Sequence, residues 1–198
     1  MTIPRLQKVL GKARYSEYKQ GLEPEFQRFT FNIFQFDLEL RALLIKAISV
    51  IELALQNQIR IVSRQSKFDS FGHARRILQE LGVSKQFLIA SRFGCTNGKE
   101  FRAALRVLND ARNRAAHHER IWNCKLNFCL PNSLKSASID AGYFAVRDFS
   151  IGGALFAAEH LLRQFPEFIN LADEIDNLLS ELPIEKKYVM NCMGFEVP

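Results

Sequence analysis

The stretch "LELRALLIKAISVIELALQNQIRIV", residues 38–62, is the most apolar part of the chain. Its large apolar residues recur at steps of three and four, which places them along one face of a helix. We expect one long helix over residues 37–64 that turns this face toward the protein core. The residues of the face are Leu40, Leu44, Ile48, Ile51, Leu55, Ile59 and Val62.

Charged residues interrupt the same stretch at Arg41, Lys46, Glu52 and Arg60. A helix that spans a bilayer tolerates such charges poorly, so we expect no membrane anchor. The first residues, "MTIPRLQKVLGKARYSEY", also lack the uncharged apolar core of a signal peptide. These patterns indicate a cytoplasmic protein with no membrane partner.

Glu52 lies at the edge of the apolar face, one turn from Ile48 and Leu55. Burying an unpartnered carboxylate is costly. Glu52 is therefore either paired with a cation or located at a functional cleft.

Helical periodicity extends along most of the chain, and we find no convincing alternating strand pattern. The predicted fold class is an all-α helical bundle. Residues 123–146 are expected to be irregular, and Pro166 separates the last two helices. Besides 37–64, the expected helices cover about 22–35, 73–82, 84–93, 99–118, 156–165 and 167–182.

The 198 residues, of which 47% are hydrophobic and 24% charged, suit a single globular domain. Seventeen phenylalanines indicate a core rich in aromatic packing. We expect one domain over 1–198, with an N-terminal extension at 1–35, a core at 36–128, and a loop with C-terminal helices at 129–198.

Positive charge is concentrated in the middle of the chain. Residues 65–128 carry 12 basic and 5 acidic side chains, whereas residues 129–198 carry 5 basic and 10 acidic ones. A basic segment of this kind suits a polyanion such as RNA, although a solvated basic face without a partner has the same composition. Charge alone leaves both alternatives open.

The four cysteines, Cys95, Cys124, Cys129 and Cys192, are too scattered to form a disulfide framework. No Cys-x-x-Cys pair supports a zinc site with His118. We therefore expect free thiols, no metal site and no cofactor.

Residues 112–123, "RNRAAHHERIWN", combine two histidines with several arginines. Imidazole can accept a proton from a ribose 2′-hydroxyl or donate one to a leaving oxygen, and a guanidinium can hold a phosphate. Arg112 and His117 lie about 140° apart around an ideal helix, whereas Asn113 and His117 share a face. Either the Arg112 side chain curls round the helix or a second copy of the motif completes the site.

The same twelve residues resemble the signature of the Abi-like family, which is linked to bacterial abortive infection and is placed among the HEPN domains. The HEPN hallmark is an Arg followed, after four to six residues, by a His, which Arg112 satisfies with His117 and with His118. Residues 36–60 resemble the preceding helix of the family, with Glu52 at a recurrent Ile-Glu position. Met193 to Phe195 resemble its C-terminal ending, so the resemblance runs from about 36 to 195.

This resemblance implies a HEPN-like helical bundle. It also implies a homodimer in which the two motif helices face each other. It implies metal-independent RNA cleavage that leaves a 2′,3′-cyclic phosphate and a 5′-hydroxyl. Arg112 would stabilise the phosphorane, His117 would act as general acid or base, and Asn113 would orient the phosphate or the imidazole. An antitoxin or a regulatory RNA would be a further partner. A non-cleaving RNA-binding or regulatory module with the same fold is the alternative.

The remaining residues of the motif are expected to support the site. The resemblance favours His117 over His118 as the working imidazole, and Glu52 is expected to pair with Arg112 or His117. Arg120 and Asn123 are expected to be structural, with Arg120 bonding helix-end carbonyls or RNA. The candidates for RNA contact are Arg106, Arg114 and Trp122, the last by base stacking if it does not pack into the bundle.

Overall fold

The computed structural model describes residues 3–65, 67–140 and 144–197. Within these ranges the chain is built from α-helices and one pair of short antiparallel strands, β1 (Ala145–Val146) and β2 (Phe195–Glu196). The predicted all-α class is confirmed.

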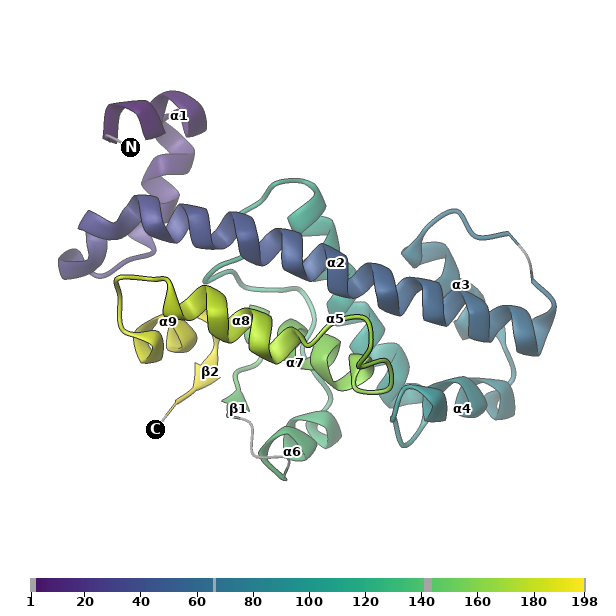
Figure 1. Ribbon diagram of the computed structural model, residues 1–198. Coiled ribbons are helices and arrows are strands. Elements are labelled where there is room, and N and C mark those ends of the chain that lie inside the picture. Colours follow the sequence, from purple (N-terminus) through teal and green to yellow (C-terminus); the bar gives the residue numbers. More distant parts are fainter. Residues whose placement is uncertain (1–2, 66, 141–143, 198) are drawn as a thin grey trace.

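Helix α2 (Thr30–Ser63) forms the long axis of the molecule (Figure 1). The apolar face predicted from the sequence is buried: Leu40, Leu44, Ile48, Ile51, Leu55 and Ile59 are each at most 1% exposed. Val62, at the end of the face, is half-buried. The apolar period therefore located the core side of this helix correctly.

The two helices expected over 22–35 and 37–64 are wrong as separate elements. A 3₁₀ helix, η1 (Pro24–Phe29), leads into α2, which continues unbroken past residue 36. The chain has no Gly or Pro between Phe29 and Ser63, so nothing in the backbone ends the helix there. The buried face also extends back through Ile33 and Asp37.

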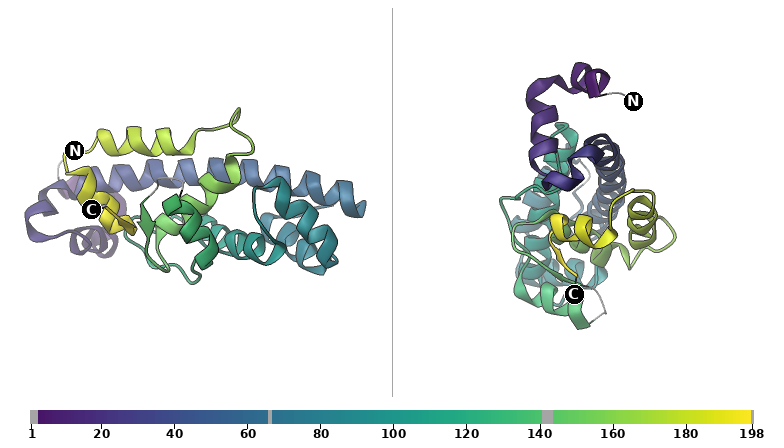
Figure 2. Two further views of the ribbon diagram at one scale, coloured as in Figure 1. Left: turned by 90° about the horizontal axis from the view of Figure 1, so that it is seen from below. Right: turned by 90° about the vertical axis from the view of Figure 1, so that its left-hand side faces the viewer.

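The other helices surround α2. Helix α8 (Leu171–Ser180) lies on one side of α2, while α5 (Gly98–Ala116) and α7 (Ile151–Leu162) pack on another (Figure 2). Helices α3 (Phe71–Glu80) and α4 (Val83–Arg92) cover the end of α2 near Ser63. Helix α7 is buried from Ile151 to Ala158, as expected for an element enclosed by α2, α5 and α8.

Helix α1 (Ile3–Gln20) was not expected from the sequence. It bends at Gly11, and its second half brings Tyr15 and Tyr18 into the buried interior. Part of the expected N-terminal extension is thus continuous with the core.

The C-terminal third contains more helix than predicted. Helix α6 (Asn132–Asp140) lies inside the segment expected to be irregular, and α9 (Lys186–Met193) was not expected. Both are short helices without a long apolar period, which is why the pattern did not reveal them. The expected irregular segment also includes residues 141–143, which lie outside the described residues.

Gly194 explains part of the C-terminal "MGF" sequence. It caps α9 with a left-handed backbone (φ 97°), and a Cβ atom there would lie 2.3 Å from the Cβ of Ser150. Only glycine fits both the conformation and the space. Next to the paired strands, the Gly194 carbonyl oxygen accepts a 2.7 Å hydrogen bond from the Arg147 N–H.

In the part of the chain that the structure describes, no helix combines the length and the apolar character that crossing a membrane requires.

Candidate functional site

Helix α5 carries the first half of the Arg-His motif. Asn97 caps its start by accepting a 2.8 Å hydrogen bond from the backbone N–H of Glu100. One face of α5 is buried against the core, as the apolar spacing predicted. Its buried residues include Phe101, Leu105, Leu108, Ala111 and Ala115. The opposite side of the helix, which carries Arg106 and Asn113, faces outward.

The helix ends at Ala116, two residues earlier than predicted. His118 adopts a left-handed backbone (φ 58°), and its N–H donates to Ala115 O at 3.2 Å. The N–H of Glu119 donates to Arg114 O at 2.9 Å. These two bonds form a Schellman motif, in which His118 is the residue that reverses the chain.

The two adjacent histidines therefore occupy different positions. His117 is the C-cap, and its backbone N–H donates to Asn113 O at 2.9 Å. Its side chain is exposed, and among the described residues none forms a hydrogen bond or ion pair with its imidazole. His118 is exposed too, but its backbone geometry is what shapes the turn.

Arg112 lies between the exposed side of α5 and helix α2. Its guanidinium donates a long 3.4 Å hydrogen bond to Asn113 Oδ1. Its charge also acts on Glu52, which accepts a 3.1 Å hydrogen bond from Gln56. Burial raises the pKa of Glu52, and the charge of Arg112 offsets part of that rise. Glu52 and Arg112 are thus neighbours, although the described residues show no direct ion pair between them.

The chain after the turn is anchored by Asp37, which is fully buried on α2. Its carboxylate accepts hydrogen bonds from the backbone N–H groups of Ile121 (2.9 Å) and Trp122 (2.6 Å). It also accepts one from Tyr18 Oη at 2.5 Å and pairs with Arg41 Nε at 3.1 Å. Four donors from three parts of the chain therefore meet at one carboxylate.

Trp122 is completely buried in the core. The expectation that its ring could stack on an RNA base is therefore wrong, because no face of the indole reaches the surface. The apolar ring fills the space beside Gly21, where a Cβ atom would lie 3.0 Å from Trp122 Cζ3. Trp122 packs into the bundle, which was the other alternative weighed for it.

Arg120 and Asn123 connect the motif to the end of α1. The Arg120 guanidinium donates to the carbonyl oxygen of Glu17, which is one of the two roles expected for it, and lies 6.0 Å from the ring centroid of Tyr18. Asn123 Nδ2 donates to Gly21 O at 3.3 Å. Arg120 is thus a second donor to the Glu17 carbonyl, which also accepts from the Gly21 N–H at 3.1 Å, and Asn123 binds the residue that follows α1.

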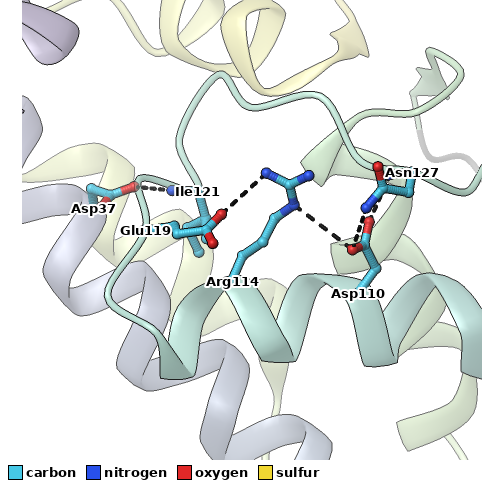
Figure 3. A network of polar contacts seen from close by, with 6 residues as sticks. All are labelled: Asp37, Asp110, Arg114, Glu119, Ile121 and Asn127. Atoms are coloured by element: carbon cyan, nitrogen blue, oxygen red, sulfur yellow. Dashed lines mark hydrogen bonds and ion pairs between the residues drawn. The ribbon is translucent and has the colours of Figure 1, made fainter.

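Arg114, a predicted RNA contact, is engaged in ion pairs within the protein (Figure 3). Its guanidinium lies between Glu119 (3.3 Å) and Asp110 (3.8 Å). Asp110 in turn accepts hydrogen bonds from the backbone N–H (2.6 Å) and side chain (2.9 Å) of Asn127. This network fastens the segment after the motif along α5.

Arg106, another predicted RNA contact, remains exposed on the outer side of α5. Its guanidinium lies 5.6 Å from the ring centroid of Phe128. Among the described residues no acidic side chain pairs with it.

The potential metal-ligating side chains are dispersed over the described residues. No three His, Cys, Asp or Glu side chains gather there in a way that could hold a metal ion. The four cysteines are unpaired thiols. Burial raises the pKa of Cys95 to about 12 and that of Cys124 to about 11, so both are protonated at neutral pH.

Sequence reasoning missed Asp37, the central acceptor of this region. The signal was present: Asp37 extends the apolar face of α2 by one position before Leu40, and Arg41 follows four residues later. A carboxylate at a core position with a cation one turn away indicates a buried, partnered charge.

Comparison with known proteins finds one family that the motif region resembles. No curated protein and no solved structure matches the chain. The model of one family, described as Abi-like protein, matches residues 65–123, which run from the end of α2 through α3, α4, α5 and the anchored tail. The match is shorter than the resemblance expected over 36–195. It includes the entire motif, so this part of the chain is similar to the Abi-like family, as the motif predicted.

Proposed function

We propose that the protein is a metal-independent endoribonuclease of the HEPN type, acting in phage defence by abortive infection or as a toxin-like effector. The observation that carries the proposal is that the two halves of the motif make different contacts. Its second half, from Glu119 to Asn123, is used to hold the turn and the tail in place. Arg112, Asn113 and His117 are left out of that network and lie at the surface end of α5.

This division argues against a purely structural role for the motif. A structural cluster would use His117 to join helices, yet its imidazole is exposed and has no partner among the described residues. The C-cap geometry fixes the backbone of His117 while its side chain stays free to reach a substrate. Fixed position and free nitrogen atoms are what proton transfer needs.

In the proposed reaction His117 removes the proton of a ribose 2′-hydroxyl or protonates the 5′-oxygen that leaves. Arg112 stabilises the negative charge that develops on the phosphorane, and Asn113 orients the phosphate. The 2′-oxygen forms a bond to phosphorus while the bond to the 5′-oxygen breaks. The products are a 2′,3′-cyclic phosphate and a 5′-hydroxyl.

A second copy of the chain would complete the site. Arg112 and His117 are five residues apart, about 140° around an ideal helix, so α5 alone does not place both groups on one face. Leu38, Ile45 and Leu53 on α2 are 41%, 37% and 67% exposed. Ile45 and Leu53 lie seven residues before and one after Glu52, so they provide apolar area beside the motif for a homodimer.

The decisive experiment incubates the purified protein with mixed single-stranded and structured RNA in EDTA and identifies the product ends. The His117→Ala and Arg112→Lys variants are expected to lose cleavage. His118→Gly is the matched control, because it changes the neighbouring histidine and suits the left-handed backbone. Cleavage that persists in His117→Ala would overturn the proposal.

A non-cleaving RNA-binding module is the second candidate, favoured because Arg112 and His117 do not share a face of an ideal helix. It predicts salt-dependent RNA affinity without products.

Sedimentation of the same samples at several concentrations tests whether the expected homodimer forms.

A further inference from the structure

Arg75 on α3 is a cation in an unfavourable environment. Its Nε atom is buried and has no hydrogen-bond partner among the described residues. Burial, and after it the positive charge of Arg106 on α5, lower the pKa of Arg75. Two neighbouring guanidiniums without an acidic partner repel each other, and an anion between them would relieve that repulsion.

The packing of α3 on α5 explains why the two arginines meet. A Cβ atom on Gly72 would lie 3.6 Å from Asn109 Oδ1, so the two helices approach closely at that point. Arg75 lies three residues after Gly72, and Arg106 lies three residues before Asn109. Each arginine therefore lies about one helical turn from this contact, close enough for the charge of Arg106 to act on Arg75.

The surface around Arg75 is hollow, and two arginines, Arg75 and Arg76, line it. A hollow of about 420 Å³ lies along α3. It contains one acidic side chain, Asp69, whose carboxylate lies 2.9 Å from His73 Nδ1. The lining residues are Asp69, Ser70, Gly72, His73, Arg75, Arg76 and Gln79.

An exposed aromatic ring adjoins the other side of Arg106. Phe128 is 42% exposed, and the Arg106 guanidinium lies 5.6 Å from its ring centroid. The preceding residue, Asn127, is bonded to Asp110 of α5 through both its backbone and its side chain. The ring is thus held beside α5 by a network that does not involve the ring itself.

We propose that Arg75, Arg106 and Phe128 form a subsite for single-stranded RNA, in which the two guanidiniums hold a backbone phosphate and the Phe128 ring stacks on an unpaired base. The proposal rests on the proposed function for its ligand. Single-stranded RNA is the ligand that combines an anionic backbone with exposed base faces. Arg106 precedes Arg112 by six residues, or about 9 Å along the helix axis. One strand can therefore reach both the subsite and the motif.

The test measures binding of two fluorescent probes, an eight-nucleotide oligoadenylate and the same ribose-phosphate chain without bases, in EDTA at several salt concentrations. All proteins carry His117→Ala to prevent cleavage. Arg75→Met and Arg106→Gln are expected to weaken both probes, with the salt dependence reduced by about 0.7 per lost phosphate contact. Phe128→Leu is expected to weaken oligoadenylate at least about fivefold and to leave the baseless chain unaffected.

Arg28→Gln, an exposed arginine on η1 at the other end of the molecule, is the matched charge control. Thermal unfolding separates a structural role from a binding one. Arg75→Met is expected to raise the melting temperature while it lowers affinity, because Arg75 is a cost to the free protein. A variant that lost stability along with affinity would contradict the subsite.

The outcomes separate the two proposals. RNA affinity of Arg75→Met and Arg106→Gln equal to that of Arg28→Gln overturns the subsite. If the parent protein, with His117 intact, still cleaves RNA, the proposed function survives that result. Affinity lost in these variants, together with no cleavage by the parent, supports the subsite and overturns the endoribonuclease.

Discussion

The carboxylate of Asp37 accepts a 2.6 Å hydrogen bond from the backbone N–H of Trp122, a residue 85 positions later in the chain. This bond joins the central helix to the tail of the motif. Asp37 is completely buried and pairs with Arg41, so a protein cation, and not solvent, balances its charge. The position of the motif therefore depends on one acidic side chain outside it.

Replacing Asp37 with Asn is expected to lower the free energy of unfolding by about 3–5 kcal/mol, because it leaves the charge of Arg41 buried without its partner. Urea denaturation followed by circular dichroism measures the change. Glu39→Gln, an exposed acid on the same helix, should change stability by less than about 0.5 kcal/mol. A loss below about 1 kcal/mol for Asp37→Asn would contradict the central role of this carboxylate.

Replacing the two histidines one at a time should affect the stability of the protein differently. His118→Gly is expected to stabilise the protein by about 0.5–1 kcal/mol, since glycine adopts the left-handed backbone without steric cost. His117→Ala should leave stability within about 0.5 kcal/mol, because the side chain is exposed. Thermal melts of both variants test this, and a destabilised His118→Gly would show that the side chain, and not the backbone, matters at that position.

Trp122 is the only tryptophan and is fully buried, so its fluorescence reports directly on the core. Its emission is expected to be blue-shifted and protected from iodide quenching in the folded protein. Addition of RNA should leave it unquenched, since the ring cannot stack on a base. Strong quenching by RNA in a protein that remains folded would mean that the indole becomes exposed on binding.

Stability should fall as the pH drops below about 6.5, in part through His160 on α7. Burial first, and then the charge of Arg163, lower the pKa of His160, against opposition from the Gly94 backbone and from Glu100 and Glu159. The unfolded chain binds the proton at a higher pH than the folded one, so acid favours unfolding. Denaturation at pH 7.5 and 5.5 measures this loss.

His160→Gln removes the titrating group, so the loss of stability between the two pH values should be smaller than in the parent protein. An unchanged difference would assign the acid sensitivity to other groups.

The sequence predicted the core side of α2 and α5 because apolar residues at helical spacing have few alternatives to burial. It predicted the ends of these helices less well. The end of α5 depends on the left-handed backbone of His118, a conformation that histidine adopts only occasionally. The start of α2 was misplaced because no local residue marks the boundary that was expected at residue 36.

The residues of the motif could be identified from the sequence. Which of them support the fold and which stay exposed could not. Nothing local indicates that Trp122 lies in the core or that Arg120 reaches the carbonyl of Glu17, more than a hundred positions earlier. Arg75 became a candidate only when the fold brought α3 and α5 together, and the bond from Ile121 to Asp37 likewise has no local signal. Contacts of this range depend on tertiary packing and leave only weak traces in a local pattern.

The left-handed turn at His118 also has a consequence for how the protein can vary. His117 and His118 are the same amino acid, but the proposed function needs the imidazole of the first, whereas the turn needs only the backbone angle of the second. Relatives that retain this turn should accept Gly or Asn at the second position and only histidine at the first. If the proposed function is correct, a sequence that swapped the order of a His-Gly pair at these positions would retain its composition and lose RNA cleavage.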